Sequence, residues 1–390
     1  MKYDFDTVVN RRGTDSIKWN VGEGELPMWI ADMDFPAAPA IRASIEKRIS
    51  HGIFGYTHTS DEWYSAYINW WRSRHGLEIK KEWMIFSVGV VPSISSIVRR
   101  LTNPAEKVLL QTPVYNAFFH SIEDNGRRVI DSPLKYDGKV FTVDFDDLEA
   151  KLSDPETTLM ILCNPHNPVG KIWDAETLAR TGELCRRHHV TVISDEIHCD
   201  ITDPGVGYVP FASVSDVCRD ISVTCVAPTK AFNIAGLHSS AVIVPNEGLR
   251  NRVKRGLNTD ELSEPNSFAE CVAVAAFNEC GEWLDELRQY IYENKKITEK
   301  FISENIPEIK ATSSDATYLM WLDMSSLGDD SRAVEEFIRN KTGLFLTAGE
   351  IYGGTGNRFV RLNVACPKET LYDGLERLRR GVKLYIEEVK

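Results

Sequence analysis

The sequence has no apolar run approaching the roughly 18 to 20 residues that a membrane-spanning helix needs. Its opening segment carries several charges and no apolar stretch of signal-peptide length. We therefore expect a cytoplasmic protein that does not cross a membrane. Basic residues are also in the minority, because 45 lysines and arginines face 57 aspartates and glutamates, for a formal net charge of −12. This charge repels nucleic acid and anionic membrane surfaces, which favours a small-molecule partner.

The usual metal-binding spacings of cysteine and histidine are missing from the sequence. The eight cysteines are scattered, and several lie in apolar runs where cysteine behaves as a small hydrophobe. We expect reduced thiols and a reducing compartment. Cys185, His188, His189, His198 and Cys199 lie close in sequence, but they form neither a CxxC nor an HExxH pair. His188 and His189 suit the C-terminal end of a helix, and no metal is predicted.

The chain is long enough for two domains. Its 390 residues contain no internal repeat, low-complexity segment or linker rich in Pro, Gly and Ser. We expect a large domain at 46–281 and a smaller α+β domain built from 1–45 and 282–390. The segments expected in the smaller domain are helices at 282–305 and 370–389 and strands at 317–323 and 359–364.

Short apolar, β-branched runs alternate with polar, helix-favouring stretches between residues 105 and 245. Apolar runs without polar alternation indicate strands that are covered on both faces. The stretch 174–189 has the pattern of a crossover helix. The pattern therefore predicts an α/β domain with a largely parallel sheet. Its expected strands are 108–111, 158–163, 190–194, 221–227 and 241–244.

Four polar side chains follow these apolar runs: Tyr115, Asn167, Asp195 and Lys230. In open α/β sheets, ligands bind outside the carboxyl ends of the strands. A pyridine-aldehyde cofactor needs an amine for its aldehyde, an anion for its ring nitrogen, a donor to its phenolic oxygen and a flat surface against its ring. Lys230, Asp195, Asn167 and Tyr115 supply these groups in that order. Each also has a structural alternative: Lys230 as a solvated loop residue, Asp195 as a helix cap and Asn167 as a turn former.

Taken together, six segments resemble the fold-type-I pyridoxal-phosphate (PLP) enzymes of the aminotransferase class I/II superfamily, and within it the MalY/PatB group of cystathionine β-lyases. The resemblance covers essentially the whole chain and implies a large domain with a mostly parallel seven-stranded sheet beside a smaller α+β domain. The MalY/PatB group is distinguished chiefly by WIADMDF at 29–35 and DEIH at 195–198. The six segments are LPMWIADMDF at 26–35, FGY at 54–56, CNPHNPVG at 163–170, SDEIHCD at 194–200, APTKAFNIAG at 227–236 and VRLN at 360–363.

The resemblance also implies a cofactor, a partner and a set of site residues. The cofactor is PLP, and the partner is a second copy of the chain in a homodimer with shared active sites, where Tyr56 reaches the neighbouring subunit's phosphate. The implied catalytic residues are Lys230, Tyr115 and Asp195. The implied cofactor-binding residues are Lys230, Asp195, Asn167, Tyr115, His198, Val90, Val91, Thr229 and Tyr56. The implied substrate-binding residues are Arg361, Ala31, Tyr115 and Asn167.

Some of these assignments leave alternatives open. Val90 and Val91 either present backbone N–H groups to the phosphate at a helix N-terminus or form an ordinary turn between a strand and a helix. Arg361, a charge in an apolar strand, either clamps the substrate carboxylate or pairs with a protein carboxylate. Many aminotransferases place a phosphate-binding arginine eight residues after the lysine. This chain has His238 there, which leaves its set of phosphate ligands open.

The resemblance implies a PLP-dependent carbon–sulfur β-lyase that converts L-cystathionine, L-cystine or a related cysteine S-conjugate to pyruvate, ammonia and a thiol. In it, Lys230 takes the Cα proton. An aminotransferase is the alternative, because the same residues serve both reactions. A PLP-binding regulator without turnover is a third reading, against which the presence of Lys230 argues. The sequence does not rank the sulfur substrates.

Overall fold

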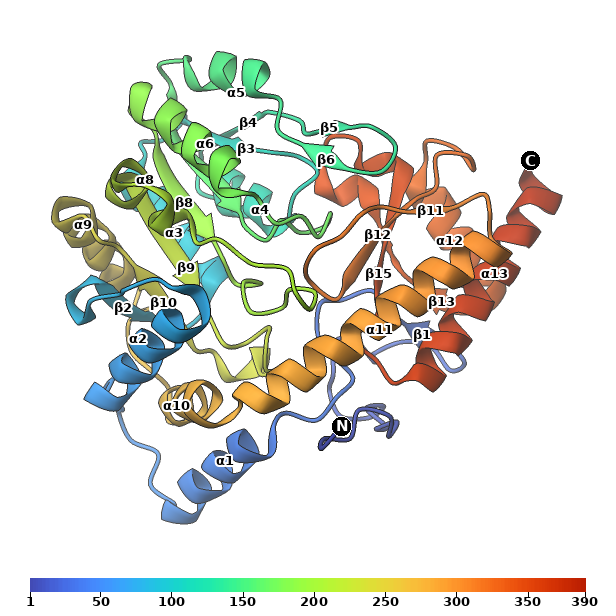
Figure 1. Cartoon of the computed structure of the whole chain (residues 1–390), viewed down its shortest axis with the longest axis horizontal. Helices are drawn as coiled ribbons and strands as arrows, with labels where there is room; N and C mark the ends of the chain where they lie inside the picture. The colour runs from blue at the N-terminus through green and yellow to red at the C-terminus, as the bar shows by residue number, and fades with distance from the viewer.

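A seven-stranded sheet forms the core of the larger part of the molecule, on the left of Figure 1, in the computed structural model, which describes all 390 residues. The strand order is β2-β10-β9-β8-β7-β3-β4. Only β10 runs antiparallel to its neighbours, β2 and β9, so the predicted, mostly parallel sheet is confirmed. The strands are β2 (Met84–Ser87), β3 (Lys107–Leu110), β4 (Arg128–Asp131), β7 (Thr157–Cys163), β8 (Thr191–Asp195), β9 (Ser222–Val226) and β10 (Ser240–Ile243).

Both faces of this sheet are buried, which explains its uninterrupted apolar runs. In β7, Leu159 and Ile161 point into the core on one face, whereas Met160 and Leu162 point into the core on the other. Because successive strand residues face opposite sides, a strand covered twice needs apolar residues at every position. The helices on the first face are α3 (Val90–Leu101), α4 (Ala117–Glu123) and α9 (Glu247–Thr259). Those on the second are α5 (Phe145–Leu152), α6 (Ala175–Arg187), α7 (Phe211–Val214) and α8 (Asp216–Ile221).

The predicted crossover helix is α6. The Asp174 side chain caps its start by accepting a hydrogen bond from the backbone N–H of Thr177 at 2.7 Å. The helix ends where His188 leaves helical geometry. The two histidines therefore sit at the helix end, as the sequence predicts.

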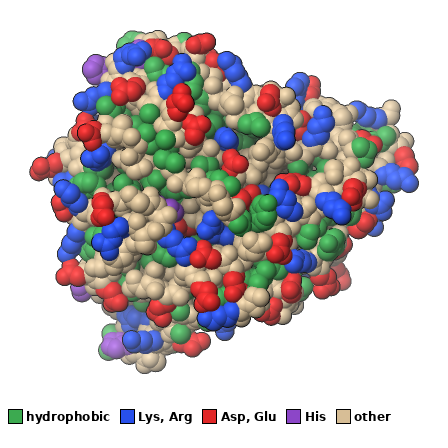
Figure 2. Space-filling view, viewed as in Figure 1, with side chains coloured by type: hydrophobic (Ala, Val, Ile, Leu, Met, Phe, Trp, Pro, Cys, Tyr) green, Lys and Arg blue, Asp and Glu red, His purple; other side chains and the backbone are tan.

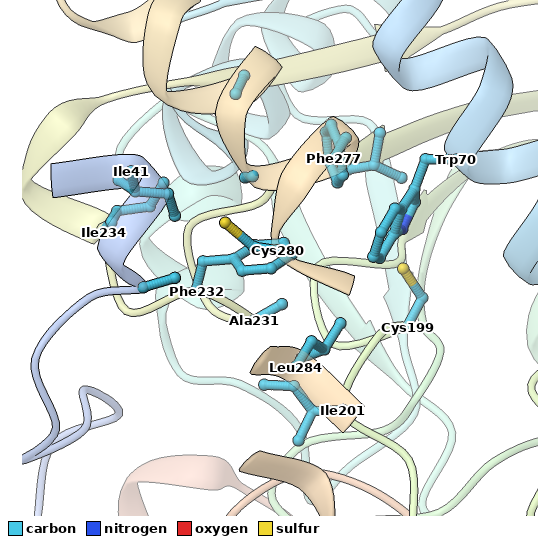
Figure 3. Packing of buried hydrophobic residues seen from close by; sticks show 14 of the residues in the cluster. Ile41, Trp70, Cys199, Ile201, Ala231, Phe232, Ile234, Phe277, Cys280 and Leu284 are labelled. Atoms are coloured by element: carbon cyan, nitrogen blue, oxygen red, sulfur yellow. The ribbon is translucent and has the colours of Figure 1, made fainter. Parts of the chain in front are cut away.

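A third layer of helices carries much of the aromatic content. It contains α1 (Pro39–His51), α2 (Asp61–His75) and α10 (Ala269–Glu279). Trp70 of α2 packs on Phe277 of α10 with ring centroids 5.2 Å apart (Figure 3). Both belong to the largest buried cluster of the chain, which joins this layer to the sheet.

A smaller α+β unit follows, coloured orange and red in Figure 1. Its antiparallel sheet has the order β11-β12-β15-β14, and β1 (Leu26–Pro27) pairs beside it with β13 (Leu344–Phe345). The domain boundaries stay a prediction; residue 45 falls within α1, and residue 281 begins α11. The other elements of this unit are α11 (Gly281–Asn305), β11 (Lys310–Ala311), β12 (Leu319–Asp323), α12 (Ser331–Thr342), β14 (Thr347–Ala348), β15 (Phe359–Asn363) and α13 (Lys368–Val389).

The surface mixes both signs of charge. On the face shown in Figure 2, basic and acidic side chains are interspersed rather than gathered into areas of one sign. None of the helices combines the length and the apolar character that crossing a bilayer requires.

Candidate active site

A cavity of about 210 Å³ opens at the carboxyl ends of the parallel strands. The four residues singled out from the sequence, Tyr115, Asn167, Asp195 and Lys230, all line it. They follow or end the strands β3, β7, β8 and β9, which are neighbours in the sheet. Parallel strands end at the same edge, so residues up to 115 positions apart in sequence meet there. The other predicted residues that line the cavity are Ala31, Val90, Val91, His198 and Thr229, and His238 lines it too.

Asp195 is the last residue of β8 and is only 4% exposed. Its carboxylate accepts one hydrogen bond, from the backbone N–H of Ile197 at 3.1 Å, and no ion pair in the chain involves it. Burial raises the pKa of Asp195 to about 7, against the lowering effect of the Ile197 N–H. A cation or a protonated ring nitrogen beside this carboxylate would favour its charged form.

Lys230 presents its amine to the same cavity without an ion-pair partner. Its Nζ donates to the backbone carbonyl of Ala31 at 2.6 Å. Burial lowers the pKa of Lys230 to about 8, with a further lowering from the Arg361 charge. A lysine in such surroundings has an accessible neutral form, as a nucleophile or general base requires.

His198 and Tyr115 complete the walls as neutral groups. His198 is 3% exposed, its Nδ1 has no hydrogen-bond partner, and burial lowers its pKa to about 3. Its ring is therefore a neutral imidazole that offers one donor and one acceptor. Burial raises the pKa of Tyr115, and the Tyr115 ring packs edge-on against Phe118 at 5.6 Å.

The start of α3 offers anion-binding groups on another wall. Val90 and Val91 are its first two residues, and the first N–H groups of an α-helix have no partner within the helix. Together with the positive end of the helix dipole, these groups make a site suited to a phosphate. Thr229 and His238 line the cavity as well, in keeping with the open set of phosphate ligands.

Arg361 is buried in β15, with 5% of its surface exposed. Its Nη1 donates to Asn167 Oδ1 at 3.2 Å and its Nη2 donates to the Trp29 carbonyl at 3.0 Å. Its Nε has no partner, and no ion pair in the chain involves it, so pairing with a protein carboxylate is not observed. Because a guanidinium only donates, Asn167 must turn its Oδ1 toward Arg361, which leaves the Asn167 amide N–H groups as donors.

Residues 29–35 cross this site as a strap, and sequence reasoning missed the side chains that hold it. Asn363 Nδ2 donates to the carbonyls of Ile30 and Asp32 at 2.7 and 2.6 Å. Tyr318 Oη donates at 3.0 Å to the same Ala31 carbonyl that receives Lys230. Asn363 ends β15, in which the only other polar residue is Arg361. A buried polar residue in such a strand was the available signal for Asn363.

The strap is also fixed by a partly buried network of charges. Lys18 Nζ lies 2.7 Å from one oxygen of Asp34, and Arg11 Nη1 lies 2.8 Å from the other. Arg11 also pairs with Asp32 at 2.8 Å. These contacts join segments whose spacing in sequence carries no motif, so sequence reasoning had no signal for them.

Tyr56 is the one predicted cofactor-binding residue that lies apart from the cavity. Its side chain is fully exposed, and it stands in the segment between α1 and α2. Within a single chain it reaches none of the other site residues. Its predicted role belongs to a neighbouring subunit and stays a prediction.

Comparison with known proteins identifies the family. The model of the aminotransferase class I and II family matches residues 17–378. Cystathionine beta-lyase PatB of Bacillus subtilis is 44% identical over 385 residues, covering 97% of this chain and 100% of the relative. Protein MalY of Escherichia coli is 33% identical over 389 residues, covering 98% and 99%.

A solved structure shares the whole architecture. Cystalysin from Treponema denticola, a structure that contains pyridoxal 5'-phosphate, has a TM-score of 0.95 to this chain at 33% identity and covers 98% of this chain and 99% of its own. The predicted fold and resemblance are confirmed. This chain belongs to the aminotransferase class I and II family.

Proposed function

We propose that this protein is a PLP-dependent carbon–sulfur β-lyase that converts L-cystathionine, L-cystine or a related cysteine S-conjugate to pyruvate, ammonia and a thiol. One observation carries the proposal. Lys230 and the buried, unpaired carboxylate of Asp195 line the same cavity. The buried Arg361, which has no anionic partner, donates a hydrogen bond to Asn167 in the cavity wall. Close relatives named cystathionine beta-lyase and cystalysin support the carbon–sulfur reaction.

The residues present fit PLP. The unpaired Asp195 carboxylate suits a protonated ring nitrogen, and the N–H groups at the start of α3 suit the phosphate. The free Asn167 amide and the His198 ring offer hydrogen bonds to the phenolic oxygen. When bound, PLP supplies a ring that takes up the electron pair left behind when the Cα proton of the substrate is removed.

The chain's own groups then divide the work. Lys230, with its lowered pKa, is the base that takes the Cα proton. Asp195 holds the ring nitrogen in its protonated form, and Arg361 binds the substrate carboxylate bidentately. Ala31 stands beside Lys230 and keeps its amine directed into the cavity through the 2.6 Å hydrogen bond.

The test of the reaction is incubation with L-cystathionine or L-cystine and no added 2-oxo acid. A lyase releases pyruvate, ammonia and a thiol or persulfide in matched amounts over many turnovers. An aminotransferase, which is the second candidate, would stop after a single turnover and resume when a 2-oxo acid was added. The second candidate is favoured by a similar structure from Clostridium difficile that is named a putative aminotransferase, which is 37% identical and has a TM-score of 0.95. A stall with every sulfur substrate would reject the lyase.

The substrate carboxylate site gives a prediction for Arg361. Arg361→Ala should raise KM for every amino-acid substrate, because losing one partner of a desolvated charge pair costs about 2 to 5 kcal/mol. Arg361→Lys should recover only part of the loss, because an ammonium cannot form the bidentate contact. The matched control is Arg358→Ala, since Arg358 lies nearby in an exposed pair with Asp329. Steady-state kinetics on several substrates are the measurement; a defect confined to one substrate would place Arg361 at a side-chain pocket.

We also propose that two copies form a homodimer with shared sites. The segment between α1 and α2 exposes large apolar side chains, which soluble monomers seldom gather in one place. Ile53 and Phe54 are 68% and 53% exposed, and Tyr56 is fully exposed. A second subunit would cover them and bring its Tyr56 to the phosphate.

The eight cysteines are all free thiols, which supports a cytoplasmic location.

Subunit mixing tests the shared site. Tyr56→Ala and Lys230→Ala should each be impaired alone, whereas their mixture, after dissociation and reassociation, should recover activity. The hybrid dimer contains one site with both native residues, if Lys230 and Tyr56 come from different subunits. Mixing two Tyr56→Ala preparations is the control. Light scattering measures the mass of the mixed protein and so shows whether it is a dimer. If the mixed dimer recovers no activity, the active sites are not shared between subunits.

A further inference from the structure

A second pocket of about 210 Å³ lies outside the active-site cavity. It is bordered by the end of α2, by the segment that follows β8 and by α11. The only active-site segment that it shares is the one carrying Asp195 and His198, whose next two residues, Cys199 and Asp200, line the new pocket. His75, the last residue of α2, lines it from the other side.

Three potential ligand atoms meet here. His75, Cys199 and Asp200 each offer one, and these atoms all lie within 4.8 Å of one another. The distance from His75 Nε2 to Asp200 Oδ1 is 2.9 Å. Imidazole, thiolate and carboxylate are the ligand types of protein zinc sites, with metal–ligand distances of about 2.0 to 2.3 Å. Small side-chain rotations would bring all three atoms around one ion.

Asp200 gives an independent indication of a ligand site. Its side chain is 3% exposed. Its Oδ1 accepts from Trp70 Nε1 at 2.8 Å and lies near His75, whereas its Oδ2 is buried without a partner. A buried, unsatisfied carboxylate oxygen is costly. Figure 3 shows the Cys199 sulfur turned toward Trp70, the residue that holds the other oxygen of this carboxylate.

Acidic side chains partly offset the basic side chains around the pocket. Arg74 and Arg288 line the pocket, but both pair with Asp285, at 2.6 and 3.4 Å. The segment that carries Cys199 and Asp200 also holds the buried side chain of Glu196. With a cysteine thiolate and an aspartate as ligands, two negative charges would balance a divalent ion.

We propose that His75, Cys199 and Asp200 form a Zn²⁺ site with its fourth position open to the pocket. Binding forms a sulfur–metal bond and releases the Cys199 thiol proton to solvent, with no change of oxidation state. The ion ties α2 to the segment that carries Asp195 and His198. This joining of two segments is independent of the proposed lyase reaction. Sequence reasoning found no metal because His75 stands far along the chain from Cys199 and Asp200.

Metal binding to the holoenzyme tests the site. After treatment with a chelator, the protein is dialysed against Zn²⁺, and bound metal is counted by elemental analysis. We expect one equivalent per chain. Co²⁺ should give d–d absorption at longer wavelengths than the cofactor band. Cys199→Ala should weaken binding by on the order of 100-fold or more, beyond the effect of losing an outer contact.

Cys271→Ala is the matched control, because Cys271 is the one cysteine that is not buried and would bind metal adventitiously. It should bind Zn²⁺ as the native chain does. His75→Gln retains a group that can donate to Asp200 and serves as the second variant should Cys199→Ala fold poorly; its affinity should fall comparably. No bound metal in the native chain, or one equivalent retained in both Cys199→Ala and His75→Gln, overturns the proposal.

Discussion

Replacing Lys230 with alanine is expected to abolish measurable turnover while the protein keeps its fold and holds PLP without a covalent bond. Removal of a general base alone costs roughly 10²- to 10⁴-fold in rate, and this variant also loses the amine that bonds to the aldehyde. The fold should survive because Lys230 makes no ion pair and its only side-chain hydrogen bond is to Ala31. Absorbance, circular dichroism and a pyruvate assay measure these effects.

The structure distinguishes Lys230 from the two buried lysines of the chain. Lys18 and Lys295 are each about 1% exposed, but both are engaged in ion pairs, with Asp34 at 2.7 Å and Asp203 at 2.6 Å. An amine held as a charged ion-pair partner is a poor nucleophile. Only Lys230 combines a lowered pKa with a place in the cavity.

Borohydride reduction followed by peptide mapping identifies the lysine that carries the cofactor. The cofactor should appear on Lys230 and be lost from the Lys230→Ala protein. Lys171→Ala is the matched control, since Lys171 follows the Asn167 loop and makes a half-exposed pair with Asp315 at 3.4 Å, a kind of pair that contributes little to stability. It should label and turn over normally. Label on any lysine other than Lys230 would refute the assignment.

Asn167, Asp195 and Lys230 could be predicted from the sequence as site residues. Each of them ends or follows a strand that is buried on both faces. The apolar runs located the strands, and the common direction of parallel strands brought Asn167, Asp195 and Lys230 to one edge. The antiparallel direction of β10 was not predicted, since an apolar run reads the same in either direction. The edge strand β4, only half-buried, gave no continuous run.

The strap over the site could not be predicted in the same way. Its supports, such as Asn363, Tyr318 and Lys18, lie in other segments, and their contacts depend on how the small unit packs against the sheet. The segment 29–35 entered the sequence reasoning only through its resemblance to a family. Its physical role, supplying backbone carbonyls to Lys230 and Arg361, becomes visible when the segments are brought together in space.

Asp195→Asn should lower kcat by on the order of 10² to 10³, the range for removing one preorganised electrostatic partner of a reacting group. The amide has nearly the same shape as the carboxylate but carries no charge, so it cannot hold a ring nitrogen in its protonated form. Cofactor binding should weaken less, because the covalent bond to Lys230 and the phosphate contacts remain. The measurements are kcat with the preferred sulfur substrate and the PLP dissociation constant.

The adjacent Glu196 provides the control for Asp195. It is also a buried carboxylate on the same segment, but its oxygens are satisfied by Ser194 at 2.7 Å, by the Phe211 N–H at 3.0 Å and by Tyr208, and it does not line the cavity. Glu196→Gln should therefore reduce thermal stability more than kcat, whereas Asp195→Asn should do the reverse.

Asp195→Asn removes a buried carboxylate whose pKa burial has raised to about 7. Because the charged form of this carboxylate is costly in the cofactor-free protein, the substitution should stabilise that protein near neutral pH. Near-native kcat in Asp195→Asn, with stability unchanged, would exclude Asp195 as the partner of the ring nitrogen.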